Sequence, residues 1–368
     1  MPDFRYGHAN AQDWREAANA CLAQLGEGAA SLGFLYVTDL LSDHLGDILA
    51  LFRGTTAVPH WVGTVGLGIC ASGREYLDEP AIAAMVGDFE PDSFRVFSGI
   101  ASVADVDNVA LKCGGATPNF AIVHADPYNR HVADLVNKLA GKVESGFLVG
   151  GLTSSRRDNL QVADGVVEGG LSGVSFADSV TVATRLTQGC SPIGPKRVIT
   201  TCQQNVIISL DGRPALDVFK EDIGEAGARD LNRLGGHIFA GLPIAGSDTG
   251  DYLVRNLVGI DPANKLVAIG EMVQPGSSVM FCRRDAKTAN EDMTRMLESI
   301  RKGLYSRPRG GIYYSCLGRG ASLFGPNSEE LRMVRDSLGD FPLVGFFCNG
   351  EISHNRLYGY TGVLTLFV

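Results

Sequence analysis

The sequence predicts an α/β (α+β) fold with two domains of mixed β-sheet flanked by helices, built from repeated strand-helix-strand units. Three observations predict it. The chain has 368 residues, whereas a single hydrophobic core stops growing at roughly 250 to 300 residues. Its 46 glycines often stand in pairs beside short apolar runs, which is typical of strand ends and tight turns. Strand-like and helix-like segments also recur in one order, and such repeated units bury a sheet against helices.

The repeat is clearest in two places. The first copy has expected strands at 120–124, 146–150 and 170–176 and a helix at 131–139. The second has strands at 311–315, 342–346 and 362–367 and a helix at 328–338. A fainter copy has strands at 32–37, 61–65 and 94–97 and a helix at 45–52. Each copy runs strand, helix, strand, loop, strand, and the interfaces between such repeats often hold a ligand.

A segment that does not follow the repeat pattern separates the two clear copies. It begins with the turn-rich stretch 189–195, and the apolar run 206–210 then meets Asp211-Gly212, a strong hairpin signal. Further strands are expected at 238–240, 253–257, 265–269 and 278–282, and helices at 215–219 and 286–304. We place the domain boundary near residue 222, which gives domains of residues 1–222 and 223–368.

Charge and hydropathy exclude several classes of protein. The net charge is −9 and no run of Lys or Arg is present, which argues against a dedicated nucleic-acid binder. The apolar runs are far shorter than the roughly 18 to 20 residues that span a bilayer, so we expect no membrane insertion. The first residues lack a basic segment followed by an apolar one, so we expect a cytoplasmic protein.

The eight cysteines show no C-x-x-C pair and no histidine at zinc-site spacing. We therefore expect no metal site, and most of the cysteines to be reduced and to pack as small hydrophobes. Cys190 and Cys316 differ, because they adjoin loops rich in glycine or proline and could be partly exposed. Arg319 could also lower the pKa of the Cys316 thiol.

Two glycine-rich clusters near the C-terminus have the composition of a ligand pocket. Residues 316–320 read Cys-Leu-Gly-Arg-Gly, and residues 345–351 read Gly-Phe-Phe-Cys-Asn-Gly-Glu. Each cluster sets glycines and a few polar groups at the end of an apolar run. Because the repeat makes them loops after successive strands of one unit, Arg319 and Glu351 could face a common cleft.

The side chains in these clusters suit a zwitterion. Gly318 and Gly320 let the backbone approach a ligand while the guanidinium of Arg319 forks onto a carboxylate. Arg255 could do likewise from a strand. Each arginine could instead form a structural ion pair, with Glu271 or Glu351 as its partner.

An amide and a carboxylate complete the candidate site. Asn349 and Glu351 would suit an α-amino group, although Asn349-Gly350 is also a frequent turn pair. The residues expected to contact a ligand are Cys190, Arg255, Cys316, Gly318, Arg319, Gly320, Phe347, Asn349 and Glu351.

In this order along the chain, the motifs resemble the FIST family, whose members pair a FIST-N with a FIST-C domain. The resemblance covers nearly the whole chain after about residue 30. The segments that carry it are 150–151, 170–174, 189–195, 210–215, 252–255, 269–271, 316–320 and 345–351. It implies a sensory domain for small ligands, amino acids among them, of a kind often fused to signalling modules. Related proteins sense nitric oxide through haem or are F-box proteins.

This chain departs from the fused architecture, because the two FIST halves use up its length and no kinase, cyclase, methyl-accepting or F-box segment is recognisable. We therefore expect a stand-alone sensory protein that binds a small polar metabolite and signals through a separate partner protein or as a homo-oligomer.

Two alternatives remain from the sequence. One is an enzyme with Cys316 or Cys190 as nucleophile, which needs a base such as His237 or His124. The other is a haem-based gas sensor, for which His237 and His354 are the least ordinary histidines. We expect no cofactor and no catalytic residue, because no spacing supports a nucleophile–base pair or a haem ligand.

Overall fold

The computed structural model describes residues 4–228, 235–244 and 252–368. The chain forms two compact units, which we call unit 1 (Met1–Thr187 and Met293–Val368) and unit 2 (Gln188–Asp292). Unit 2 is inserted into unit 1, and its two ends touch, because the backbone N–H of Gln188 donates to Oδ2 of Asp292 at 2.5 Å. The chain thus leaves unit 1 and returns to it at one place.

Unit 1 consists of three copies of one repeat. Each copy has an outer strand, a helix, two parallel strands joined through a helix, a hairpin and a final strand. Repeat 1 comprises β1 (Phe4–Asn10), α1 (Trp14–Leu25), β2 (Leu32–Thr38), the 3₁₀ helix η1 (Asp39–His44), α2 (Leu45–Thr56), β3 (His60–Gly66), β4 (Gly68–Ala71), β5 (Arg74–Leu77) and β6 (Ala81–Gly87).

The other two repeats follow the same order. Repeat 2 comprises β7 (Phe94–Ile100), α3 (Val103–Asn108), β8 (Phe120–Ala125), α4 (Val132–Ala140), β9 (Phe147–Leu152), β10 (Gln161–Ala163), β11 (Val166–Val167) and β12 (Leu171–Phe176). Repeat 3 comprises β13 (Val182–Gln188), α6 (Ala286–Gly303), β22 (Gly310–Cys316), α7 (Ala321–Phe324), α8 (Glu329–Leu338), β23 (Leu343–Cys348), β24 (Glu351–Ser353), β25 (Arg356–Tyr358) and β26 (Thr361–Phe367).

Strand pairing is the same in the three repeats. The central pairs β2–β3, β8–β9 and β22–β23 are parallel, and the final strands β6, β12 and β26 run antiparallel to β2, β8 and β22. Gly63, Gly150 and Gly345 occupy equivalent positions on the second parallel strand. A Cβ atom on any of them would lie 1.8 Å from a carbonyl oxygen of the neighbouring strand, so the pairing requires glycine there.

Each hairpin leaves its own repeat and extends the sheet of another. Hairpin β4–β5 of repeat 1 pairs with β23 of repeat 3, β10–β11 of repeat 2 pairs with β3 of repeat 1, and β24–β25 of repeat 3 pairs with β9 of repeat 2. The exchange is cyclic. It gives three six-stranded sheets, each made by two repeats.

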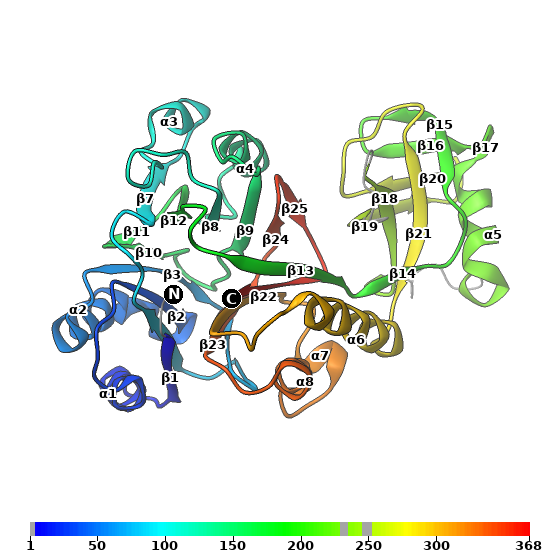
Figure 1. The fold of residues 1–368 in the computed structure, drawn as a ribbon. Helices are drawn as coiled ribbons and strands as arrows, with labels where there is room; N and C mark the ends of the chain where they lie inside the picture. The colour runs from blue at the N-terminus through cyan, green and yellow to red at the C-terminus, as the bar shows by residue number, and fades with distance from the viewer. Residues whose placement is uncertain (1–3, 229–234, 245–251) are drawn as a thin grey trace. The chain divides into compact units, whose positions relative to one another are not determined.

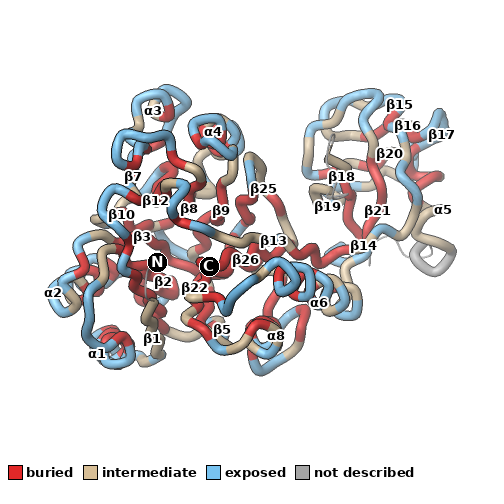
Figure 2. The backbone as a smooth tube through the Cα atoms, in the orientation of Figure 1, coloured by how far each residue is buried: buried red, intermediate tan, exposed pale blue. Residues whose placement is uncertain are grey.

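The three sheets enclose one central core. Side chains alternate between the two faces of β2, so that Phe34 and Tyr36 lie in this core. They pack there with Ile122, Ile312 and Val344 from the other sheets. The opposite faces are covered by helices: α1 and α2 pack on repeat 1, and α4 packs on repeat 2. Figure 1 shows the helices around the outside of unit 1, and Figure 2 shows that the strands are the buried part and the helices carry the exposed faces.

The fold class predicted from the sequence is confirmed, as are the two clear copies of the repeat. The faint copy is also real, but the prediction of its last strand was wrong. The run at 94–97 lies in β7, which opens repeat 2, and the strand that closes repeat 1 is β6. The sequence pattern does not indicate β6, because Ala-Ile-Ala-Ala-Met-Val-Gly is buried along its whole length and shows no alternation of apolar and polar residues.

Unit 2 is a closed antiparallel barrel. Its strands are β14 (Cys190–Pro192), β15 (Arg197–Gln203), β16 (Val206–Leu210), β17 (Arg213–Pro214), β18 (Ile238–Pro243), β19 (Tyr252–Asp261), β20 (Leu266–Ile269) and β21 (Ser278–Arg284). The ring closes because β18 pairs with both β19 and β21. Helix α5 (Ala215–Ala228) follows the predicted Asp211-Gly212 hairpin turn, and Leu216 and Phe219 enter the barrel core.

The division into compact units therefore differs from a division along the sequence. Residue 222, which we expected at the boundary, lies within α5 of unit 2. The predicted domains of residues 1–222 and 223–368 concern the two halves of the family pattern, and they stay a prediction.

Candidate functional site

The two glycine-rich clusters lie at the carboxyl ends of the parallel strands β22 and β23. Cys316 is the last residue of β22 and Cys348 is the last residue of β23, and the two are register partners. The carboxyl ends of all three parallel pairs meet here, because the Ser154 hydroxyl after β9 accepts from the N–H of Leu67 after β3 and donates to the carbonyl of Phe347 in β23. In open α/β sheets, ligands bind at the carboxyl ends of parallel strands.

Arg319 is buried at this edge and forms an ion pair. Its Nε lies 2.7 Å from Oε1 of Glu330 on α8, and both side chains are fully buried. The guanidinium also stands over the ring of Phe324, 4.9 Å from the centroid. The ion-pair partner is Glu330, eleven residues further along the chain, and neither Glu271 nor Glu351.

Both carboxylate oxygens of Glu330 have hydrogen-bond partners. Its carboxylate also accepts hydrogen bonds from the hydroxyls of Tyr313 and Ser315 and from the backbone N–H of Gly320. Burial disfavours the charge on Arg319, but the Glu330 carboxylate more than offsets this and holds the pKa of Arg319 above its ordinary value. A buried pair with this many hydrogen bonds fixes the loop after β22.

Gly320 is required by this arrangement. Its φ is +56°, and a Cβ atom there would lie 2.8 Å from the ring of Phe347 and 3.0 Å from Oε2 of Glu75. Glu75 lies on β5 of the hairpin that repeat 1 donates to this sheet. Burial, with the Glu330 charge, raises the pKa of Glu75 to about 7. No sequence signal points to Glu75, because its hairpin comes from the other end of the chain.

Glu351 is a second buried carboxyl group at the same edge. It is fully buried, and its Oε2 accepts hydrogen bonds from the N–H and the hydroxyl of Thr361. Burial raises its pKa to about 8, and the charge of Arg319 acts against that shift. At neutral pH this carboxyl group is therefore mainly protonated.

We call Arg319, Glu330, Glu75 and Glu351 the Arg319 centre. Three of its polar atoms, Nη1 of Arg319, Oε2 of Glu75 and Oε1 of Glu351, are buried and make no hydrogen bond to any other part of the chain that the structure describes. The Cys316 thiol lies beside the Glu351 carboxyl group. The centre can therefore offer one hydrogen-bond donor and two carboxyl oxygens to a small polar molecule.

The remaining predicted residues are placed as follows. Gly318 is partly exposed in the loop over Arg319, and Phe347 is buried in β23. Asn349 is exposed in the turn between β23 and β24, whereas Glu351 is buried, so the structure separates these two side chains. Arg255 and Cys190 belong to unit 2. Arg255 forms an ion pair with Glu271 at 2.8 Å, which is the structural alternative that the sequence left open.

The cysteines do not have the environment of nucleophiles. Cys190 lies in β14 and is buried, whereas its loop-rich sequence surroundings suggested that it could be partly exposed. Burial raises the pKa of the Cys316 thiol to about 12, and the nearby Arg319 only moderates this, so the predicted lowering was wrong. A thiolate is the reactive form of cysteine, and these surroundings disfavour it.

The two histidines named as candidate haem ligands lie at the surface. His237 and His354 are exposed, and His354 packs edge-on against Phe147 at 4.5 Å. Across residues 4–228, 235–244 and 252–368, no three side chains of His, Cys, Asp or Glu are grouped to hold a metal ion. None of the helices seen in these ranges could cross a membrane.

Comparison with known families decides what this architecture belongs to. The FIST N domain profile matches residues 31–213, and the FIST C domain profile matches residues 215–354. The chain belongs to the FIST family. FIST domains are sensory domains of signal-transduction proteins. The FIST N match ends before unit 2 is complete and the FIST C match begins inside it, so the inserted barrel is shared by both domains.

Relatives match this FIST chain over nearly its whole length. An uncharacterized protein of Mycobacterium tuberculosis is 30% identical over 381 residues, which cover 98% of each chain. An uncharacterized protein of Mycobacterium bovis is 29% identical over 372 residues, which cover 96% of this chain and 94% of the relative.

Proposed function

We propose that this FIST protein is a stand-alone sensory protein that binds a small polar metabolite, with an amino acid as the preferred candidate, at the Arg319 centre. The signal would pass to a separate protein or through self-association. The observation that carries the proposal is the set of three buried polar atoms without hydrogen-bond partners in the described residues. Each such atom costs roughly 1 to 3 kcal/mol, and native proteins keep few of them without a functional reason.

A zwitterion complements these atoms. Its carboxylate can accept from Nη1 of Arg319, while its ammonium group can donate to Glu75 and Glu351. The segment that covers the centre contains Gly318 and Gly320, and Cys316 to Gly318 are partly exposed. A ligand would enter by displacing this segment, and the displaced loop would be the signal.

Binding of an ammonium group should expel protons. Glu75 and Glu351 have pKa values raised to about 7 and about 8, so both are partly or mainly protonated at neutral pH. A positive charge beside them favours their ionised forms. The affinity for an amino acid should therefore increase as the pH rises from 6 to 8, and calorimetry in buffers of different ionisation enthalpy should register the released protons.

The test is a thermal-shift screen of amino acids and other small polar metabolites on the wild type and two variants. Glu351→Gln removes the ionisable group but keeps its shape, and Glu329→Gln changes a half-exposed glutamate on the same helix as Glu330. A ligand at 100 times its Kd raises stability by about 2.7 kcal/mol. We expect Glu351→Gln to weaken binding at least tenfold and Glu329→Gln to bind like the wild type. A ligand that binds Glu351→Gln unchanged contradicts the proposal, and so does a screen without any stabilising compound.

The geometry gives no support to a reaction. An acyl- or group-transfer enzyme would need a cysteine with a lowered pKa and a base within hydrogen-bond distance, whereas the pKa of Cys316 is raised. We therefore assign binding and no catalytic role to the Arg319 centre.

A further inference from the structure

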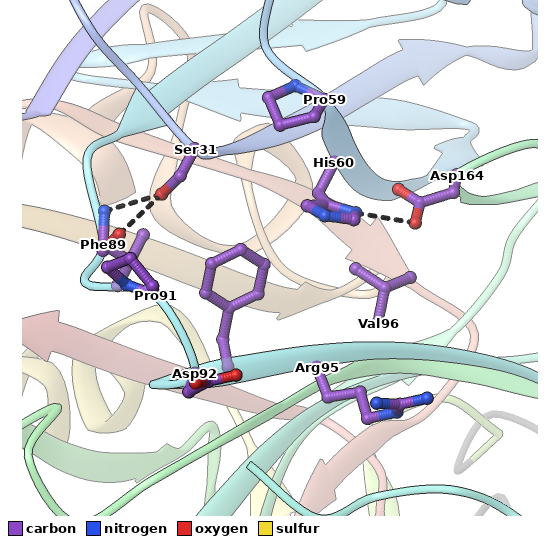
Figure 3. A pocket seen from close by; sticks show the side chains of 10 residues that line it. Ser31, Pro59, His60, Phe89, Pro91, Asp92, Arg95, Val96 and Asp164 are labelled. Atoms are coloured by element: carbon purple, nitrogen blue, oxygen red, sulfur yellow. Dashed lines mark hydrogen bonds and ion pairs between the residues drawn. The ribbon is translucent and has the colours of Figure 1, made fainter. Parts of the chain in front are cut away.

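A second site lies at the other end of unit 1. A cavity of about 490 Å³ is lined by residues at the amino ends of β2 and β3 and in the connection from β6 to β7. Figure 3 shows its lining side chains. Its volume is within the roughly 300 to 1,000 Å³ of small-molecule pockets. The Arg319 centre, in contrast, lies where the carboxyl ends of the parallel strands meet.

The polar feature of the cavity is an oriented histidine. Nδ1 of His60 lies 2.8 Å from Oδ2 of Asp164, and the other carboxylate oxygen, Oδ1, accepts from the backbone N–H of Trp61 at 2.9 Å. Asp164 is fixed further, since its carbonyl accepts from Arg53 and its own N–H donates to the carbonyl of Trp61. Because an ionised carboxylate only accepts, the imidazole proton is on Nδ1. When the ring carries this one proton, Nε2 is therefore a hydrogen-bond acceptor.

The cavity walls suit a flat ring. Phe94 packs edge-on against His60, with ring centroids 5.5 Å apart, and Phe89 packs against Phe94 at 5.8 Å. Proline side chains add further apolar surface. The Ser31 hydroxyl is already used, because it donates to the carbonyl of Phe89 and accepts from its N–H. A ligand would thus meet aromatic and apolar surface together with the polar side chains of His60, Asp92, Arg95 and Asp164.

The charges around the cavity disfavour an anion. Asp92, Arg95 and Asp164 all line it, and Figure 3 shows Asp164 next to His60, with Asp92 and Arg95 across the cavity from that histidine. The carboxylate nearest to His60 is therefore that of Asp164, which repels a ligand carboxylate, and the propionates of haem would meet the same repulsion. The available polar groups near His60 are acceptors, so they require a donor from the ligand.

We propose that this cavity binds a small aromatic molecule that carries a hydroxyl or amino donor, with the donor directed at Nε2 of His60 and Asp164 as the positioning residue that keeps Nε2 an acceptor. The site is independent of the Arg319 centre, and it goes beyond the function proposed above.

Two probe molecules measure the contribution of the ligand's hydrogen-bond donor to binding. p-Cresol and 4-methylanisole have nearly the same shape, but only p-cresol has an O–H to donate. We expect p-cresol to bind the full-length protein about tenfold more tightly in calorimetry or ligand-observed NMR. The His60 side chain is 45% exposed before a ligand covers it, and one well-placed hydrogen bond is worth up to about a factor of ten. Equal affinities for the two probes, or no binding of p-cresol at millimolar concentration, would overturn the proposal.

Asp164→Asn tests the positioning role. Its amide oxygen must stay on the N–H of Trp61, so its NH₂ group faces Nδ1 of His60 and moves the imidazole proton to Nε2. Nε2 then donates, both probes can accept, and the tenfold preference should fall toward one. Asp158→Asn removes one charge from an exposed position on the loop before β10 and should keep the preference. An unchanged preference in Asp164→Asn contradicts the assignment of Nε2 as acceptor.

Two further variants test whether p-cresol binds in this cavity. Val96→Phe should fill the cavity and abolish p-cresol binding, whereas Glu351→Gln should leave it unchanged. The thermal midpoint of each variant shows whether it is folded. If Val96→Phe does not fold, the binding preference of Asp164→Asn tests the proposal instead. Loss of p-cresol binding in Glu351→Gln would place the probe at the Arg319 centre and refute the second site.

Discussion

The carboxyl groups around Arg319 differ in what they can still bind. Glu330 takes hydrogen bonds from four neighbouring groups, so it is a structural partner. Glu75 and Glu351 each keep one oxygen without a partner in the described part of the chain, and burial raises both pKa values. Nε of Arg319 thus has the structural role that the sequence left open, and Nη1 is the atom through which the proposed ligand contact would be made.

The raised pKa of Glu351 predicts a dependence of stability on pH. Its pKa is about 8 in the folded protein, against 4.5 for an ordinary glutamate. The folded state therefore holds a proton that the unfolded state releases, and the stability due to this group is present below pH 4.5 and lost as the pH rises through 8. Glu351→Gln cannot titrate. Between pH 5 and 8, the free energy of unfolding of the wild type should fall relative to that of Glu351→Gln by up to about 1.4 kcal/mol per pH unit.

Urea denaturation of both proteins at pH 5, 6, 7 and 8 measures this difference. Glu329→Gln is the control, because Glu329 is half-exposed beside Arg332, and its curve should run parallel to the wild type. Parallel curves for the wild type and Glu351→Gln would show that Glu351 is ionised in the folded state.

At the scale of elements, unit 1 depends on close pairing of its parallel strands. Gly63, Gly150 and Gly345 stand at the same place in the three repeats, and each faces a backbone carbonyl that leaves no room for a Cβ atom. These glycines explain why glycine pairs recur in the sequence beside apolar runs.

Gly150→Ala should destabilise the protein by at least about 2 kcal/mol, because a methyl group would force β8 and β9 apart. A methyl group added at Gly54, in helix α2, would meet no atom within 4 Å, and Gly54→Ala should stabilise by roughly 0.5 to 1 kcal/mol. Thermal or urea unfolding of the two variants measures whether the free energy of unfolding falls in Gly150→Ala and rises in Gly54→Ala. A neutral Gly150→Ala would mean that the sheet can relax and that the repeat does not depend on this glycine.

The sequence predicts the helices and strands better than it predicts which strands and side chains come into contact. The strand-helix-strand order of repeats 2 and 3 could be predicted, because local apolar runs and turns mark it. The exchange of hairpins could not, since nothing local in Glu75 or in β5 indicates pairing with a sheet of repeat 3 far along the chain. The Arg319–Glu330 pair was hidden for a similar reason, because the loop and α7 between them set its geometry. His60 and Asp164 are 104 residues apart, and their pairing also depends on the exchanged hairpin β10–β11.

At the scale of the whole molecule, unit 2 is an insertion into the third repeat. Its ends meet at Gln188 and Asp292, and unit 1 has its own closed set of three sheets and a central core. The insertion divides β13 from α6. The sequence pattern showed all three repeats only from their first parallel strand onward, at β2, β8 and β22, so the missed start of the third repeat is not specific to the insertion.

Replacing residues 189–291 with a short Gly-Ser linker should therefore leave a folded unit 1. We expect a single cooperative unfolding transition, dispersed amide resonances, and the binding of metabolite and p-cresol retained. A deletion variant that is soluble but lacks a cooperative transition would show that unit 1 needs the barrel to fold.

The proposed sensory role depends on the binding of a small polar ligand at the Arg319 centre. A crystal structure of the protein with the most stabilising compound from the metabolite screen would locate that ligand. We predict ligand density within hydrogen-bond distance of Nη1 of Arg319 and of the free oxygens of Glu75 and Glu351, with the segment 316–320 displaced. Density elsewhere, with these three atoms as buried and unpartnered as before, would contradict the proposed function.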